Sequence, residues 1–297
     1  MKKIILGILI ILSMISNVNA KTLLGGVRWN YDTDDLRIIE LYGGYKEDFE
    51  EAQFAQVETG WSHYEDKDGE RDFNFISLLG QKNLIFDTYG FGLIRFNDGD
   101  DFDCVTGSTY LVKEFERWRV EAFAERSMVE SQLAMDDEIM WNLYGVGVDY
   151  IINETFTLVG LYSFTDSSDG NTRDTEEIGL VYSPQWAQKW YAKFRLKWSQ
   201  SDFDPIEYFA PEEYEKYDVL FSYTTGFAGD QGLFVIQFAP GWQIIDGEGE
   251  IAYEYRIILN YLFTRNWEIE SFIAGVNDEG TDRYRYNWGG IQLNYNF

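Results

Sequence analysis

The chain contains a single histidine, His63, in the stretch Trp61-Ser-His-Tyr64. Histidine is a common general base, and next to a serine or a carboxylate it could serve a hydrolytic site. Alternation along this stretch places Val57, Thr59, Trp61 and His63 on one mainly apolar face. We therefore expect His63 to lie in an interfacial band of aromatic residues, and we predict that the protein is not an enzyme.

Three acidic runs have the composition of calcium-binding loops: residues 32–35, 66–70 and 98–103. None has the spacing of an EF-hand loop. We favour solvated loop tips, with divalent cations shared with anionic surface lipid as the alternative. One cysteine and one histidine exclude cysteine-rich and histidine-rich metal sites. We predict no metal and no other cofactor.

A basic stripe stands out in a chain of formal charge −27. Lys193, Arg195 and Lys197 alternate with apolar residues on one strand, and further charged residues occupy matching faces of other strands: Arg119, Glu121, Glu125, Glu254, Arg256, Glu268 and Glu270. Two interpretations stay open. The charges neutralise one another between neighbouring strands, or they line a hydrated track for a polar polymer or solute.

The elements that carry these residues alternate with a period of two, which is the pattern of β-strands. The segments run about 9–13 residues, which suits tilted strands that cross a membrane. About sixteen of them predict an all-β, antiparallel transmembrane barrel. They lie near residues 22–31, 36–45, 53–64, 72–80, 85–97, 104–114, 118–127, 140–150, 155–165, 175–183, 189–199, 215–224, 231–240, 249–261, 265–276 and 284–297.

The connections between these segments differ on the two sides. Several are short (114–117, 152–155 and 263–266), whereas the longest follow odd-numbered segments (128–139, 166–174 and 200–214). Short turns on one side and long loops on the other are typical of outer-membrane barrels, and an even number of strands predicts periplasmic termini. We expect all four prolines, Pro184, Pro205, Pro211 and Pro240, in connections or at strand ends.

The two ends of the chain indicate export and membrane insertion. Residues 1–20 have two lysines, an apolar run and small residues before a cleavage site, which predicts a signal peptide, and residues 21–297 then form the barrel. The final stretch, residues 291–297, alternates to a terminal Phe297 and looks like the C-terminal signature of outer-membrane barrels. We expect the outer membrane of a Gram-negative-type bacterium, with its lipid and the barrel-assembly machinery as partners. So acidic a chain predicts no nucleic-acid binding.

Two loop motifs resemble a known family. Ser168-Asp-Gly-Asn-Thr-Arg173 supplies Asp169, Asn171 and Arg173, and Tyr208-Phe-Ala-Pro-Glu-Glu-Tyr214 supplies Tyr208, Phe209, Pro211 and Tyr214. In this order they resemble the C-terminal barrel domain of bacterial exopolysaccharide-export proteins of the poly-N-acetylglucosamine and cellulose type. Residues 125–131 look like the arginine-rich segment of that family. Ala210 departs from its usual serine.

The resemblance implies a non-enzymatic channel that passes a polysaccharide outward. The family's tetratricopeptide repeats are missing here, so either a separate periplasmic repeat protein supplies that scaffold or the protein does something simpler. The residues themselves support a sharp turn at Asp169–Asn171 and an aromatic loop that either stacks on sugar rings or merely packs against the rim. We expect an acidic interior to favour neutral or cationic glycans. The alternative is a general diffusion porin or a structural surface barrel for small polar solutes.

Overall fold

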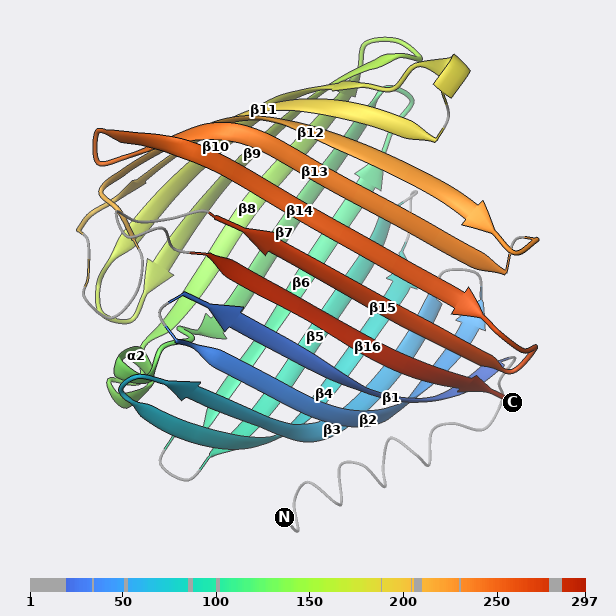
Figure 1. Ribbon diagram of the computed structural model, residues 1–297, viewed down its shortest axis with the longest axis horizontal. Coiled ribbons are helices and arrows are strands. Elements are labelled where there is room, and N and C mark those ends of the chain that lie inside the picture. The colour runs from blue at the N-terminus through green and yellow to red at the C-terminus, as the bar shows by residue number, and fades with distance from the viewer. Residues whose placement is uncertain are drawn as a thin grey trace.

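The described residues form one closed antiparallel barrel of sixteen strands in the computed structural model (Figure 1). They comprise residues 20–33, 35–50, 53–84, 88–99, 102–187, 189–203, 205, 210–229, 231–277 and 285–297. Each strand pairs with the next along the chain, and β1 closes the ring on β16. The predicted fold is confirmed. The predicted signal peptide lies almost entirely outside the described residues.

Successive strands are β1 (Ala20–Asp32), β2 (Arg37–Glu50), β3 (Gln53–Asp66), β4 (Gly69–Asn83), β5 (Thr88–Gly99), β6 (Cys104–Glu114), β7 (Trp118–Met128), β8 (Met140–Ile151), β9 (Phe156–Ser167), β10 (Thr172–Tyr182), β11 (Trp190–Ser201), β12 (Glu213–Phe227), β13 (Gly232–Ile245), β14 (Glu248–Leu262), β15 (Trp267–Val276) and β16 (Tyr286–Asn296). A short helix, α2 (Gln132–Asp136), follows β7, and a 3₁₀ turn (Gln185–Ala187) follows β10. No helix among the described residues is long and apolar enough to cross a membrane.

All sixteen predicted segments coincide with strands, and the differences lie at their ends. The predicted long loop at residues 166–174 is wrong, because β9 continues to Ser167 and β10 begins at Thr172. Gly170, with φ of 92°, makes the sharp reversal between them. Most strands are longer than the periodicity indicated, since polar residues continue the pairing beyond the apolar stretch, whereas β5, β15 and β16 are shorter.

Pro240 does not lie at a strand end. It lies within β13 and is paired with Tyr253 of β14. The ladder to β12 passes from Asp218↔Gly241 to Phe221↔Phe238 without the two intervening pairs. Proline has no N–H to donate, so β13 tolerates it by giving up local pairing with β12. The expectation for Pro240 is therefore wrong.

The two ends of the barrel differ in their connections. The longest, residues 129–139, 202–212 and 277–285, all join an odd strand to an even one. The same end also has two-residue turns, such as Asp246–Gly247, whose φ angles of 48° and 86° fit a type I′ hairpin. β1 begins and β16 ends at the opposite end, called here the termini end (Figure 1). The side of the membrane that this end faces stays a prediction.

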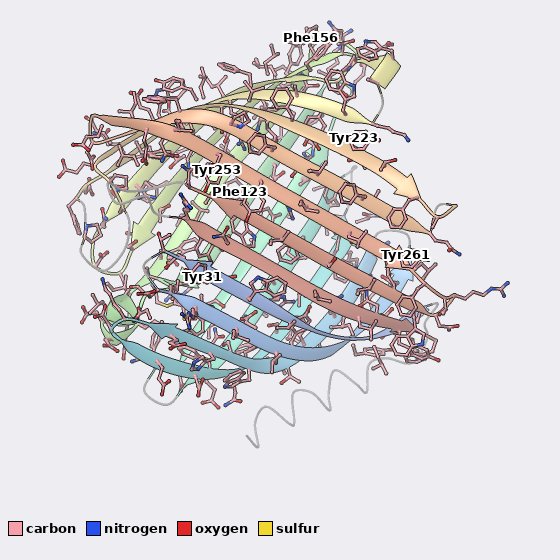
Figure 2. All side chains as sticks on the ribbon, viewed as in Figure 1. Tyr31, Phe123, Phe156, Tyr223, Tyr253 and Tyr261 are labelled. Atoms are coloured by element: carbon pink, nitrogen blue, oxygen red, sulfur yellow. The ribbon has the colours of Figure 1, made fainter. Side chains whose placement is uncertain are left out.

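The outward face of the barrel is apolar, with aromatic residues where strands begin and end at the termini end. Their rings pair between neighbouring strands, with centroids 4.4 Å apart for Trp118 and Tyr150 and 4.7 Å apart for Trp267 and Tyr295. Phe156 and Tyr261 belong to the same band (Figure 2). An apolar outer face bordered by aromatic residues is the pattern of a transmembrane barrel.

Candidate functional site

The inward face of the barrel is identified by contacts that skip strands. Arg28 of β1 bonds Glu58 of β3 at 3.0 Å, and Arg195 of β11 bonds Glu254 of β14 at 2.7 Å. Such side chains can meet only on the concave side of a closed sheet. Because cross-strand partners share a face, the register then assigns every inward residue.

This register places all the residues of the predicted charged track on the inward face: Arg119, Glu121, Glu125, Lys193, Arg195, Lys197, Glu254, Arg256, Glu268 and Glu270. Their placement follows from the strict alternation of β7, β11, β14 and β15. Their role in a solute path stays a prediction.

The basic stripe on β11 is paired with carboxylates from both neighbouring strands, β10 and β12. The Lys193 ammonium lies 2.7 Å from Glu177 of β10. The Arg195 guanidinium makes a two-pronged contact with Asp218 of β12, at 2.6 and 2.8 Å. Asp218 and Glu177 were not predicted as its partners, because a single acidic residue in a polar strand does not indicate which residue of a neighbouring strand it will contact.

Lys197, the third residue of the stripe, is held differently. Its ammonium lies 5.0 Å from the centre of the Tyr214 ring, a cation–π distance. Tyr214 is inward-facing, next to the beginning of β12, and is 4% exposed. The structure thus connects one residue of the stripe with one residue of the aromatic loop motif.

Arg119 anchors a second charged group on β7 and β8. Its guanidinium lies 3.2 Å from Glu121 and 3.4 Å from Asp149, and it donates to the Tyr89 hydroxyl at 3.3 Å. On β15, Glu270 accepts a hydrogen bond from the Asn294 amide at 2.6 Å. Ionic contacts therefore occur on well-separated parts of the inward wall.

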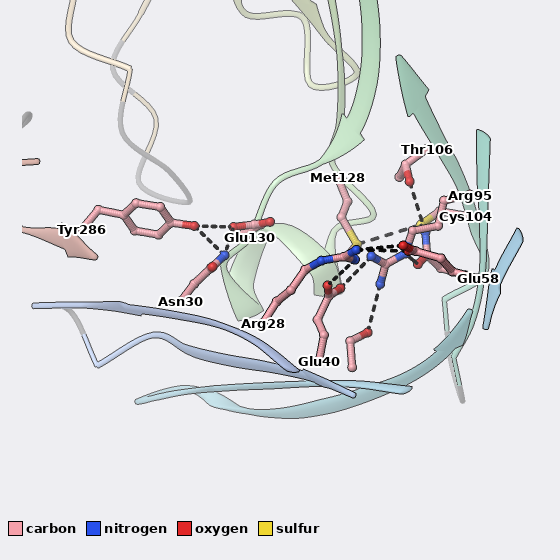
Figure 3. Close-up of polar contacts among 12 residues, drawn as sticks. Arg28, Asn30, Glu40, Glu58, Arg95, Cys104, Thr106, Met128, Glu130 and Tyr286 are labelled. Carbon is pink, nitrogen blue, oxygen red and sulfur yellow. Dashed lines mark hydrogen bonds and ion pairs between the residues drawn. The ribbon is translucent and has the colours of Figure 1, made fainter. Parts of the chain in front are cut away.

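A third charged group, which the sequence pattern did not predict, is formed by Arg28, Glu40, Glu58 and Arg95 (Figure 3). Glu40 lies between the two arginines, 3.5 Å from Arg28 and 2.6 Å from Arg95. Each guanidinium also covers an aromatic ring, Arg28 over Tyr42 at 3.9 Å and Arg95 over Phe75 at 3.7 Å. Paired glycines in β1 and β2 interrupt the alternation there, which hid which face points inward.

A loop extends across the bore at the end opposite the termini. We call residues 129–139, between β7 and β8, the cross-bore loop. Its helix α2 begins after Ser131, whose hydroxyl accepts from the Ala134 N–H at 3.2 Å. Met135 is 1% exposed and packs in an apolar cluster with Ile38, Tyr64 and Phe73 of β2, β3 and β4.

Arg71 of β4 fastens the far side of this loop. It donates to the Met135 carbonyl at 3.0 Å and pairs with Asp136 at 2.7 Å. The loop therefore reaches from its own strands to the wall at β3 and β4. The sequence marked it only as a long connection, because its partners are distant along the chain.

A second polar contact holds the cross-bore loop to β1 and β16. The Tyr286 hydroxyl donates to Glu130 Oε2 at 3.1 Å, and Asn30 Nδ2 donates to the Tyr286 oxygen at 2.6 Å (Figure 3). Glu130 lies in the connection, outside the strands. Burial away from water raises the pKa of its carboxyl group.

The first loop motif contacts the end of β11 and the start of the connection that carries the second motif. Asn171 Nδ2 donates to the Phe203 carbonyl at 3.0 Å, and Asp169 Oδ1 accepts from the Asn171 N–H at 3.1 Å. Arg173 donates to the Ser201 hydroxyl at 2.9 Å. Pro211 lies just before β12. Tyr208 and Phe209 lie outside the described residues.

His63 lies on the outward face, as its alternation indicated. Its ring stacks against Trp61 with centroids 5.6 Å apart, and its Nδ1 lies 2.7 Å from Asp72 of β4. The pair faces away from the charged interior, because Ser62 and Phe73 are the inward partners at this position. Within the described part of the chain, no group of three His, Cys, Asp or Glu side chains is arranged to hold a metal ion.

Comparison with known proteins adds structural neighbours only. No family model matches the chain, and no curated protein sequence matches it. A solved structure described as a bacterial polysaccharide outer membrane secretin aligns with a TM-score of 0.68 and 12% identity, over 95% of this chain and 100% of that chain.

Two porin structures align less well. OccK7 (OpdD) of Pseudomonas aeruginosa has a TM-score of 0.49 and 10% identity, over 94% of this chain and 98% of that chain. The KdgM porin, in complex with disordered oligogalacturonate, has a TM-score of 0.39 and 9% identity, over 92% of this chain and 99% of that chain. At these identities the likeness shows the fold, which is that of outer-membrane β-barrels.

Proposed function

We propose that this protein is an outer-membrane channel that passes a polysaccharide outward without catalysis. The observation that carries the proposal is the inward wall of ion pairs, with Arg195 between Asp218 and Glu254 as its best example. Barrels of about 16–18 strands leave an aqueous passage. A wall of charged and hydrogen-bonding groups beside that passage suits a hydrated, hydroxyl-rich chain.

The ion pairs also bear on the kind of glycan. The sequence suggested an acidic interior, but the lumenal carboxylates Glu40, Glu58, Glu177 and Asp218 each have an arginine or lysine within 4 Å. Paired charges largely cancel at a distance, so these parts of the wall attract neither sign strongly. The substrate proposed is therefore a neutral polysaccharide, or a weakly cationic one.

One structural neighbour bears on the proposal of a polysaccharide channel. The barrel that aligns at a TM-score of 0.68 over 100% of its own length is described as a polysaccharide outer membrane secretin. At 12% sequence identity, the two proteins share the fold of the barrel and no more than that can be inferred from the alignment. Export would be driven by synthesis or by a partner, and the proposed partners are a separate periplasmic repeat protein, outer-membrane lipid and the barrel-assembly machinery of a Gram-negative-type bacterium.

A diffusion porin is the second candidate, and the cross-bore loop favours it. Met135 and Arg71 anchor the loop on one side of the bore, and Glu130 anchors it on β1 and β16. A bore that is crossed by a fixed loop admits small solutes more readily than it admits a polymer. The two candidates therefore differ in whether this end opens wide enough for a chain.

Polymer passage can be measured with liposomes that contain the refolded protein. Vesicles loaded with fluorescent neutral linear glucans of graded length should release chains much longer than any sugar that fits wholly within the barrel. Vesicles without protein provide the baseline, and an anionic glycan of equal length should leave more slowly. Release restricted to mono- and disaccharides would reject polysaccharide passage and establish the porin.

A further inference from the structure

We propose that a hollow in the inward wall near the termini end is a binding subsite for one uncharged pyranose unit of a glycan. The proposal rests on the proposed function and assigns a place within the channel where sugar is held. The hollow lies between β7 and β11 and has a volume of about 440 Å³. Small-molecule sites are commonly concavities of about 300–1,000 Å³ with an apolar lining and a few well-placed polar groups.

The lining of the hollow has the two-sided chemistry of a sugar ring. Val159, Leu161 and Val181 supply an apolar surface, and Tyr191 adds an aromatic ring. Charged groups lie on both sides, with Arg119 near Asp149 at 3.4 Å and Lys193 near Glu177 at 2.7 Å. A pyranose presents C–H groups on its faces and hydroxyls at its edge, so its faces suit the apolar surface and its edge suits the charged pairs.

The charges of the hollow favour an uncharged sugar. The two basic side chains, Arg119 and Lys193, each already lie next to a carboxylate, and Arg119 has a second one, Glu121, at 3.2 Å. A carboxylate or sulfate on the sugar would have to displace one of these acidic partners. A hydroxyl can donate to a carboxylate and accept from a guanidinium or ammonium without separating the pair, and such charge-assisted bonds are the stronger ones.

Gly147 provides the space. A Cβ atom there would lie 3.7 Å from Leu161 Cδ1 and 3.8 Å from Glu121 Cβ, which are ordinary contacts. A longer side chain would therefore extend into the hollow without disturbing the backbone. Gly145, the preceding inward residue on β8, differs, because a Cβ atom there would lie only 2.1 Å from the Phe123 ring, which already fills the space.

The position of the hollow suits an early step of export. Arg119 and Tyr191 each follow the first residue of their strand, and Ser183 comes directly after β10. All three lie at the termini end, away from the cross-bore loop. On the proposed orientation, a glycan that arrives from the periplasm meets this hollow before it reaches the narrowed end.

The test uses single-channel current of the full-length refolded protein in planar bilayers, with neutral cello-oligosaccharide as the probe. Gly147→Leu fills the hollow. Gly92→Leu is the control, because it adds the same side chain to the outward face, where a Cβ atom would meet no other atom within 4 Å. Glu177→Gln keeps the shape and removes one charge. The half-blocking concentration should rise about tenfold or more in Gly147→Leu and Glu177→Gln, and should stay unchanged in Gly92→Leu.

The outcomes separate the subsite from the proposed function. If the oligosaccharide blocks Gly147→Leu and Glu177→Gln at the same concentration as the wild type, the subsite is rejected. The proposal of glycan passage would not be affected by that result. A wild-type channel that no neutral oligosaccharide blocks, and that releases no long glucan from liposomes, would overturn both. Loss of block in Gly92→Leu as well would attribute the effect to a disturbed barrel and would also reject the subsite. Heat-modifiable gel mobility of each variant establishes that it has folded.

Discussion

The Tyr286 hydroxyl donates a 3.1 Å hydrogen bond to Glu130, although the two residues belong to opposite sides of the ring. Glu130 precedes β8, Tyr286 begins β16, and these strands are eight places apart in either direction around the closed sheet. Adjacent-strand pairing cannot produce this contact. The cross-bore loop therefore reaches the opposite wall of the barrel, where this bond helps to anchor it.

Removal of that bond should loosen the cross-bore loop. Tyr286→Phe deletes the donor to Glu130 and keeps the ring, so we expect a larger or noisier single-channel current. Tyr31→Phe is the matched control, because Tyr31 is an exposed residue of the outward face. Identical current traces for the two variants would show that the bond does not restrain the loop.

The same anchor should depend on pH through Glu130. Burial raises the pKa of its carboxyl group from the ordinary value of 4.5, with smaller opposing effects from Tyr286, Asn30 and Arg95. The folded state then holds the proton more tightly than the unfolded state does. This contribution to stability is present below the unfolded pKa and is lost as pH rises through the folded pKa.

We therefore expect current fluctuations to increase as pH is raised above the ordinary glutamate range. Glu130→Gln, which stays uncharged, should remove the dependence, whereas Glu116→Gln in a connection at the other end should preserve it. Fluctuations that follow the same pH curve in Glu130→Gln and in the wild type would attribute the effect to other groups.

Arg195 should matter for stability more than a surface arginine does. Its guanidinium bonds Asp218, whose side chain is 2% exposed, so Arg195→Ala leaves this buried carboxylate with only the Lys216 ammonium, 3.9 Å away. Breaking such a pair costs about 3 kcal/mol or more. Arg37→Ala is the control, since Arg37 and Glu65 are 58% and 49% exposed and 4.0 Å apart, and exposed pairs contribute little. Urea unfolding in detergent measures both, and equal midpoints would contradict the assignment.

His63→Ala should leave conductance unchanged and reveal no lost hydrolytic activity. The imidazole stacks on Trp61 on the outward face, where it contacts Asp72 and not the lumen. Ester, lipid and peptide hydrolysis can be assayed with the refolded protein. Hydrolysis by the wild type that disappears in His63→Ala would reject the non-enzymatic proposal.

The sequence predicts much of this fold because a membrane barrel requires the same alternation on every strand. β11 shows why: Trp190, Phe194 and Trp198 must face outward, so Lys193 and Arg195 must face inward. Where the alternation is weak, prediction fails. Gly43 and Gly44 follow Tyr42 on β2, and the Arg28–Glu40 group beside them was missed.

Long-range side-chain contacts could not be predicted at all. The contacts of Glu130 with Tyr286 and of Met135 with Phe73 depend on the folded path of a loop, which no local pattern specifies. Strand ends were also misjudged where polar residues continue the pairing, as at Ser167 and Thr172. Pro240 shows the same limit, because a gap of two pairs in the ladder to β12 lets β13 continue past it.

The most direct measurement is single-channel conductance of the refolded protein, with neutral and anionic oligosaccharides of equal length added to the termini side. We expect a steady open current that neutral oligosaccharide blocks reversibly, with block times that lengthen as the chain lengthens. Anionic oligosaccharide should block far less, because the arginines and lysines that could bind it are already paired with carboxylates of the wall. A current indifferent to every glycan, or no current at all, would contradict the proposal of a polysaccharide channel.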